Sequence, residues 1–122
     1  MNETPIRFLV VDDQENIRRL CLSVASGLGF QCSEAASAED ALARVECDVP
    51  DIVLSDLGLP DMTGHDLMRQ LKDQYGFKGI AMSGYGMEED IKQSKAAGFS
   101  EHLVKPMNLE QLAQSIERLG GE

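Results

Sequence analysis

The sequence has few of the residue types that build several common kinds of binding site. It contains no tryptophan, two histidines and three cysteines, and its 11 basic residues are outnumbered by 21 acidic ones, for a net charge of −10. That balance argues against nucleic-acid binding by this domain, because phosphate backbones attract clustered Lys and Arg. No apolar run approaches the roughly 18 residues of a membrane span, and the polar N-terminus is unlike a signal peptide. We therefore expect a cytoplasmic protein without membrane contact.

The cysteines show no pattern of a metal site or a disulfide framework. Cys21, Cys32 and Cys47 are odd in number, widely spaced and free of any C-x-x-C pair, so neither zinc nor disulfides are indicated. We predict three reduced and mostly buried thiols, as is usual in a cytosolic protein.

The length of 122 residues and the apolar content of 43% predict a single domain over residues 1–122. Short apolar runs have the composition of buried strands, and stretches with helical spacing separate them. The predicted strands are Ile6–Val11, Gln31–Ala35, Ile52–Ser55, Gly79–Met82 and His102–Val104. The predicted helices cover about 17–28, 37–45, 66–73, 88–97 and 109–119. Gly29 and Gly98 are predicted to end the first and the fourth, and Asn108 to be the N-cap of the last. This alternation predicts a doubly wound α/β fold, in which helices cover both faces of a parallel sheet.

Charged and hydroxyl side chains follow four of the predicted strands. They are Asp12, Asp13, Asp56, Ser83 and Lys105. In open parallel α/β sheets, sites form outside the carboxyl ends of the strands, so we expect these side chains to share one cleft. Three carboxylates at one place repel one another, and a hard divalent ion such as Mg²⁺ relieves that repulsion through oxygen ligands. An aspartate beside such an ion and a lysine is suited to accept a phosphoryl group.

Other interpretations exist for each residue and for the set. Singly, the acids could be helix caps or turn residues and Lys105 a solvated surface lysine. A metal-dependent phosphohydrolase would use similar acids, but in a D-x-D arrangement, whereas Asp12 and Asp13 are adjacent. A dinucleotide- or flavin-binding module predicts a glycine-rich turn after the first strand, where this chain places Asp12 to Glu15 and their negative charge.

Four segments resemble the receiver domains of bacterial two-component response regulators. They are LVVDD at 9–13, IVLSDLGLPDMTG at 52–64, MSGYG at 82–86 and LVKP at 103–106. The resemblance extends from Ile6 to about Leu119. It implies a flavodoxin-like five-stranded sheet with strand order 2-1-3-4-5 and five helices on its two faces.

The resemblance implies a metal site as well as a phosphoacceptor. Asp56 would accept the phosphoryl group. Asp13, Asp56 and the backbone carbonyl of Gly58 would bind Mg²⁺ directly, with Mn²⁺ as a substitute. Asp12 would act largely through a metal-bound water.

The resemblance also implies roles for residues around the phosphoryl group. Lys105 would pair with it, and Ser83 would turn toward it once it is bound. Structural roles are implied for three residues, which are Pro60, Gly64 and Pro106, and the Lys105-Pro106 peptide is expected to be cis. A degenerate receiver that serves only as an interaction module is disfavoured, because the acids, the serine and the lysine are all present.

In this family the phosphoryl donor is a phosphohistidine on a histidine kinase or a histidine phosphotransfer domain. The receiver assists its own phosphorylation, changes conformation and slowly hydrolyses the acyl phosphate, so the resemblance implies a regulatory domain rather than an enzyme. Output through self-association or contact with an output domain is implied for the face over residues 88–119. The SGYG and HLVKP stretches resemble receivers attached to hybrid sensor kinases.

Two features depart from the family pattern. Three residues before the lysine, where Tyr or Phe is usual, stands His102. Either this ring follows the inward switching path and makes the active state pH-sensitive, or it is a half-exposed strand residue without a switching role. Gly58, two residues after Asp56, has no side chain to fill the space there, whereas the residue two after Ser83 is the bulky Tyr85. We therefore expect Tyr85 to control the lifetime of the phosphoryl group more than position 58 does.

Overall fold

Five strands and five helices make up the part of the chain that the structure, a computed structural model, describes: residues 5–84, 88–106 and 108–120. The strands are β1 (Arg7–Val11), β2 (Gln31–Ala35), β3 (Ile52–Asp56), β4 (Lys78–Ser83) and β5 (Glu101–Val104). The helices are α1 (Glu15–Gly27), α2 (Ala38–Cys47), α3 (Gly64–Lys72), α4 (Glu88–Ala97) and α5 (Leu109–Gly120). All strand pairs are parallel, in the order β2-β1-β3-β4-β5. The predicted fold class and strand order are confirmed, and the predicted boundaries agree to within two residues.

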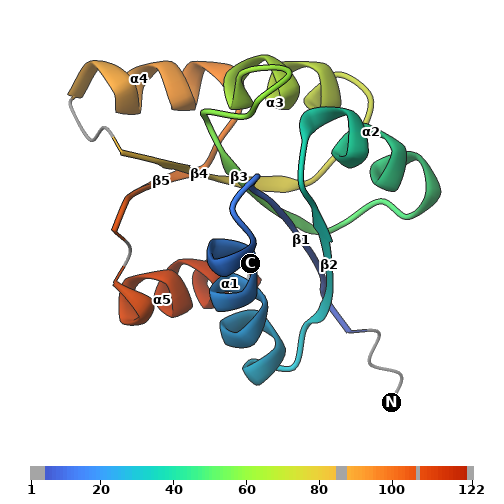
Figure 1. Cartoon of the computed structure of the whole chain (residues 1–122), viewed down its shortest axis with the longest axis vertical. Helices are drawn as coiled ribbons and strands as arrows, with labels where there is room; N and C mark the ends of the chain where they lie inside the picture. Colours follow the sequence, from blue (N-terminus) through green and yellow to red (C-terminus); the bar gives the residue numbers. More distant parts are fainter. Residues whose placement is uncertain (1–4, 85–87, 107, 121–122) are drawn as a thin grey trace.

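The helices cover both faces of the sheet, α1 and α5 on one and α2, α3 and α4 on the other (Figure 1). Alternating side chains of β1 divide the core in two. Phe8 and Val10 belong to the cluster that includes α1 and α5, and Leu9 and Val11 to the cluster of the other three helices. All of β3 is buried, because β1 and β4 flank it and helices cover both faces. The backbone of β3 is therefore held firmly up to its last residue, Asp56.

Local signals in the sequence set several of the helix ends. Gly29 and Gly98 follow α1 and α4 with φ of 89° and 114°, a left-handed conformation that glycine adopts without strain. Asn108 Oδ1 accepts hydrogen bonds from the backbone nitrogens of Glu110 at 2.8 Å and Gln111 at 3.2 Å. The predicted N-cap of the last helix is thus confirmed.

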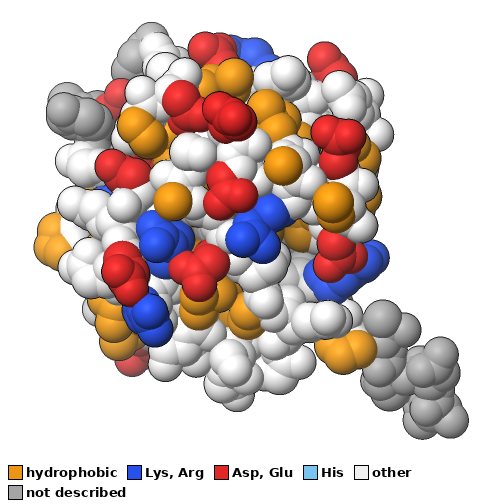
Figure 2. All heavy atoms as spheres, turned by 45° about the vertical axis from the view of Figure 1, so that its right-hand side comes forward, with side chains coloured by type: hydrophobic (Ala, Val, Ile, Leu, Met, Phe, Trp, Pro, Cys, Tyr) orange, Lys and Arg blue, Asp and Glu red, His pale blue; other side chains and the backbone are white. Residues whose placement is uncertain are grey.

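On the face shown in Figure 2, acidic side chains are scattered and basic ones lie beside them. Arg19 and Glu15, one helical turn apart, form an ion pair at 2.8 Å, and exposed pairs of this kind contribute little to stability. Within the described ranges, no helix combines the length and the apolar character that a bilayer crossing requires.

All three cysteines are free thiols. Cys21 is fully buried, and burial raises the pKa of its thiol to about 12, which makes it unreactive. Cys32 is half-buried and Cys47 is exposed. The prediction of mostly buried thiols is therefore wrong for Cys47, because it lies off the stripe by which Ala41 and Val45 bury α2.

The loop between β3 and α3 is tied to the start of α2 by Asp61. Its carboxylate oxygens accept hydrogen bonds from the backbone nitrogens of Ala38 at 3.0 Å and Glu39 at 2.9 Å. Ser37 Oγ accepts from the backbone nitrogen of Asp40 at 3.1 Å. The first three N–H groups of α2 thus have partners, and the two that bind Asp61 lower the pKa of its carboxyl group.

We predict that Asp61→Asn lowers the urea midpoint of unfolding, because the amide offers one acceptor oxygen where the carboxylate offers two. The folded-state pKa of Asp61 lies below its ordinary value of 3.8. The stabilisation is therefore complete above that value and is lost as the pH falls through the folded-state pKa. Unfolding curves of both proteins from about pH 7 to about pH 3 should show a gap that narrows below about pH 4. A gap that is constant with pH would contradict an ionic cap.

Gly64, the first residue of α3, packs closely against the backbone of Asp56 and Leu57. A Cβ added there would lie 2.6 Å from the backbone oxygen of Asp56 and 2.7 Å from Cα of Leu57, whereas a Cβ at Gly58 would meet nothing within 4 Å. We predict that Gly64→Ala costs about 1–3 kcal/mol of unfolding free energy by overpacking. Gly58→Ala, the matched control, should stay within about 1 kcal/mol of the parent protein. Equal losses in urea unfolding would show that close approach at Gly64 does not fix this loop.

Candidate functional site

The carboxyl ends of four strands meet at one end of the sheet, and the predicted site residues lie there. Carboxylate oxygens of Asp12, Asp13 and Asp56 fall within 4.8 Å of one another. Lys105 Nζ lies 3.0 Å from Asp12 Oδ2 and 3.4 Å from Asp56 Oδ2. Ser83, the last residue of β4, lines a cleft together with Asp56. The structure therefore brings together the five residues that the sequence places at strand ends.

Burial and charge act against each other in this cluster. Asp12 has no exposed surface, and burial raises the pKa of its carboxyl group against the opposing effects of a backbone hydrogen bond from Gln14 and of Lys105. Burial alone would lower the pKa of Lys105, but its hydrogen bond to Asp12 and the charges of Asp12 and Asp56 outweigh that effect and raise it. The raised pKa keeps Lys105 protonated, and its one positive charge faces three carboxylates, which is a formal excess of two negative charges.

Asp56 is held on rigid backbone at the edge of the cleft. Its Oδ1 accepts a hydrogen bond from the backbone nitrogen of Gly58 at 3.3 Å, and the Ser55 hydroxyl donates to its backbone oxygen at 3.0 Å. The backbone nitrogen of Leu57 donates to the carbonyl of Met82 at 3.0 Å, which continues the pairing with β4 past Asp56. With 8% of its surface exposed, Asp56 can be reached from the cleft.

The loop that carries Asp12 and Asp13 is held by a residue that sequence reasoning missed. Arg18 donates from Nη1 to the backbone oxygen of Asp12 at 2.7 Å and from Nε to Glu34 Oε1 at 2.7 Å. This clamp joins α1 to the ends of β1 and β2. A signal was present, because Arg18 stands three residues before the buried Cys21, on a side of the helix where a charged group needs a partner.

The donor set fits a hard divalent cation. The side-chain ligands of the acidic cluster are all carboxylate oxygens, which Mg²⁺ prefers, whereas softer ions favour thiolate and imidazole. The cleft beside Asp56 has a volume of about 250 Å³, and its lining includes Gly58, Thr63, His65 and Ser83. An ion and a small anion can therefore meet at Asp56 from the solvent side.

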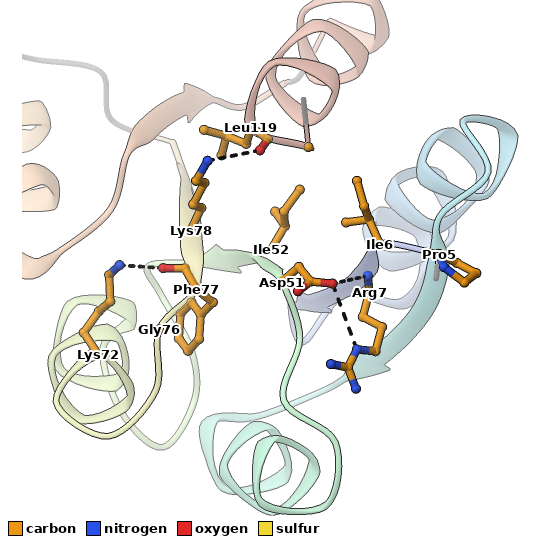
Figure 3. A pocket seen from close by; sticks show the side chains of 11 residues that line it. Pro5, Ile6, Arg7, Asp51, Ile52, Lys72, Gly76, Phe77, Lys78 and Leu119 are labelled. Carbon is orange, nitrogen blue, oxygen red and sulfur yellow. Dashed lines mark hydrogen bonds and ion pairs between the residues drawn. The ribbon is translucent and has the colours of Figure 1, made fainter. Parts of the chain in front are cut away.

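A second hollow, of about 670 Å³, lies at the opposite end of the sheet, where the strands begin (Figure 3). Lys72 and Lys78 each donate to a backbone carbonyl there, and Asp51 accepts from the backbone nitrogen of Arg7 (Figure 3). Its charged groups are thus engaged in holding the fold together. Ligands of open α/β sheets bind at the other end, the carboxyl end of the strands, so this hollow is not the candidate site.

His102 lies on β5 with its half-buried ring between two serines. Nε2 is 3.0 Å from Ser83 Oγ, and Nδ1 is 2.9 Å from Ser94 Oγ. The ring thus contacts the site, and a switching role stays a prediction. Ser94 was missed by sequence reasoning, although it follows Ile91 and precedes Ala97 at a spacing of three, where a polar residue on an inward helix face indicates a partner.

Three further residues had roles predicted from the sequence. The Lys105-Pro106 peptide is cis, as expected. Pro60 is exposed in the loop between β3 and α3. Tyr85 lies outside the described residues, so its expected influence on the lifetime of the phosphoryl group stays a prediction.

Known proteins are similar to this chain in both sequence and fold. The response regulator receiver domain family matches residues 8–117. Sporulation initiation phosphotransferase F of Bacillus subtilis is 33% identical over 120 residues, which are 97% of this chain and 94% of that protein. The sensor histidine kinase RcsC of Salmonella typhi is 33% identical over 110 residues, which are 88% of this chain but 12% of the kinase. The chemotaxis response regulator CheY4 of Vibrio cholerae has a TM-score of 0.89 at 28% identity, with 95% of this chain and 99% of that chain covered.

The match extends over most of the chain and agrees with the geometry of the acidic cluster. Receiver domains are regulatory phosphoacceptor domains, which receive phosphoryl groups from histidine kinases or phosphotransfer proteins. This chain belongs to the response regulator receiver domain family of two-component phosphotransfer signalling.

Proposed function

We propose that Asp56 takes a phosphoryl group from the phosphohistidine of a histidine kinase or phosphotransfer domain, in a reaction that requires Mg²⁺, and later loses it by slow hydrolysis. The meeting of three carboxylates, an ammonium group and a hydroxyl group at one end of the sheet carries this proposal. Asp12 is fully buried and Asp13 does not line the cleft, whereas Asp56 lines it beside Ser83. Among the three acids of the cluster, Asp56 is therefore the one that faces this cleft.

The acids of the cluster would hold the metal ion. Asp13, Asp56 and the backbone carbonyl of Gly58 would bind it directly, and Asp12 would bind one of its waters, with Mn²⁺ able to replace Mg²⁺. The bound ion supplies charge neutralisation and orientation to the phosphoryl oxygens. The two net negative charges of the cluster support this assignment, because a divalent ion compensates them in full.

The transfer step needs few protein groups, and Lys105 and Ser83 would supply them. A carboxylate oxygen of Asp56 attacks phosphorus while the N–P bond of the phosphohistidine breaks, and the imidazole nitrogen keeps the electron pair and takes up a proton. Lys105 Nζ, 3.4 Å from Asp56 Oδ2, pairs with one phosphoryl oxygen, and the Ser83 hydroxyl donates to another. Because the Lys105 ammonium group already lies beside Asp56, it can stabilise the developing charge with little reorganisation.

Hydrolysis returns the site to its starting state. The oxygen of a water molecule attacks phosphorus, the P–O bond to Asp56 breaks, and the products are inorganic phosphate and a free carboxylate. Between the two steps, contacts of Lys105 and Ser83 with the phosphoryl group bias a conformational equilibrium. Because the backbone nitrogen of Lys105 donates to the carbonyl of Ser83 at 2.7 Å, movement at β4 reaches β5 and the face over residues 88–119. An output domain or a second copy of the chain would bind that face.

We predict that incubation with acetyl phosphate and Mg²⁺ adds one phosphoryl group to the protein and none to Asp56→Asn, whose amide lacks a nucleophilic oxygen. Intact mass spectrometry measures the adduct, and removal of the metal with EDTA should abolish it. Asp13→Asn is the matched control, because it weakens metal binding but leaves the acceptor in place, so its adduct should return at higher Mg²⁺ concentration. An adduct on Asp56→Asn would place the phosphoryl group elsewhere, and no adduct on the parent protein would reject the proposal.

Lys105→Gln tests the balance of charge in the cluster. Without the ammonium group the carboxylates repel each other more, so we predict a loss of about 1–3 kcal/mol of unfolding free energy in EDTA. Saturating Mg²⁺ should restore part of it, because the ion then compensates more charge. The rate of adduct formation should fall, since one phosphoryl oxygen loses its cationic partner. Urea unfolding and the mass assay measure the two effects, and weaker Mg²⁺ binding by the variant would contradict the assigned role.

A further inference from the structure

A chain of hydrogen bonds leads from Ser83 away from the acidic cluster. Ser83 Oγ is 3.0 Å from His102 Nε2, His102 Nδ1 is 2.9 Å from Ser94 Oγ, and Ser94 Oγ is 3.2 Å from His65 Nε2. The four residues come from β4, β5, α4 and α3 respectively. We call them the Ser83–His65 relay.

The members of the relay are held in place by burial and packing. Ser94 has no exposed surface and Ser83 has 5%, so a hydrogen bond left unmade by either hydroxyl group is costly. The His65 ring packs edge-on against Phe99, with ring centroids 6.4 Å apart, which fixes the direction of its Nε2. Burial, followed by the charge of Arg69, lowers the pKa of His65 against the opposing charges of Asp66 and Asp90. The neutral form of that ring, which can both donate and accept, is therefore favoured.

The relay has two complete arrangements of its protons. A hydroxyl group can donate and accept, and a neutral imidazole donates from one nitrogen and accepts at the other. In the outward arrangement, Ser83 donates to His102, which donates to Ser94, which donates to His65, and both imidazoles carry their proton on Nδ1. In the inward arrangement all three bonds are reversed, and both imidazoles carry their proton on Nε2.

We propose that His102, Ser94 and His65 are positioning residues for Ser83, and that a phosphoryl group on Asp56 selects the inward arrangement; this inference rests on the proposed function. Phosphoryl oxygens are anionic acceptors, so one of them accepts a hydrogen bond from the Ser83 hydroxyl group. The Ser83 oxygen then accepts from His102 Nε2–H, which leaves His102 Nδ1 to accept from Ser94.

The last bond of the relay follows from the same rule. Once Ser94 donates to His102, its oxygen accepts from His65 Nε2–H. The tautomer of His65 on α3 therefore depends on whether Asp56 is occupied. The number of protons in the relay stays the same: each hydroxyl group rotates, and each imidazole releases its Nδ1 proton to water and takes up one at Nε2.

Nitrogen NMR of the imidazole rings tests the proposal directly, since the chain contains only two histidines. The protein, labelled with ¹⁵N in histidine, is compared in Mg²⁺ alone and in Mg²⁺ with beryllofluoride, a mimic of the phosphoryl group. The pH is set about two units above the ordinary imidazole value of about 6.5. We expect the population of both rings to move toward the Nε2–H tautomer when beryllofluoride binds.

Ser94→Ala interrupts the relay at its centre without touching the acidic cluster. In this variant the His102 ring should still respond to beryllofluoride, whereas the His65 ring should not. Ser115→Ala is the matched control, because Ser115 is also buried in a helix, with 3% exposure, and its hydroxyl group donates to Glu101 Oε1 at 2.8 Å. It should lose stability in the same way, yet keep both ring responses.

A rate measurement gives a second readout that loss of packing would not reproduce. Phosphorylation of Ser94→Ala by acetyl phosphate should be about three- to tenfold slower than that of the parent protein, the equivalent of one hydrogen bond. Ser115→Ala should keep the parent rate.

Different outcomes separate failure of the relay from failure of the proposed function. If fluorine NMR shows beryllofluoride bound to the parent protein but the His65 ring does not respond, the relay is wrong and phosphoacceptor function stands. A His65 response that persists in Ser94→Ala also overturns the relay, because the signal then travels by another route. If neither beryllofluoride nor acetyl phosphate yields an adduct at Asp56, the proposed function falls, and the relay falls with it.

Discussion

Repulsion among three carboxylates is the constraint on which the rest of the site depends. Folding brings oxygens of Asp12, Asp13 and Asp56 within 4.8 Å of one another, although Coulomb energy alone would keep them apart. Lys105 offsets one charge through contacts of 3.0 and 3.4 Å, and Arg18 fixes the backbone of Asp12. The charge that remains makes the site suited to a cation. Stability is thus lower at this end of the sheet than packing alone would allow, as is common where a site needs unpaired charge.

The parallel sheet is what makes such a concentration of charge possible. Four of the five strands bring polar side chains to their carboxyl ends, and the buried middle of β3 holds Asp56 at a fixed place between β1 and β4. Contacts between segments that are distant in the sequence also stabilise the loop after β3. Asp61, just after the acceptor segment, caps α2, and the close approach of Gly64 to the backbone of Asp56 leaves that segment little freedom. A phosphoryl group arriving at Asp56 therefore meets a rigid frame on one side and the relay of Ser83 on the other.

The sequence predicted those parts of the molecule that depend on local pattern and topology. Apolar runs marked the strands, glycines and Asn108 marked helix ends, and the rule that sites form at strand ends identified the acidic cluster. Arg18, Ser94 and His65 were not identified, because their partners depend on how each helix is rotated about its axis. That rotation follows from the packing of whole faces, which one residue in a sequence does not reveal. Each of the three nevertheless lies on or beside an inward face, where a polar side chain indicates a partner.

The two hydrogen bonds of His102 decide how this ring can respond to phosphorylation. An inward swing, one of the two interpretations that the sequence allowed, would break the contacts of both nitrogens with Ser83 and Ser94. Each bond contributes about 0.5–1.5 kcal/mol, so the swing would cost more than a change of tautomer, which keeps both. The two proton arrangements of the relay contain the same three hydrogen bonds, each with its direction reversed. A single anion next to Ser83 is then enough to shift their populations, and a histidine at this position can transmit the state of Asp56 without moving.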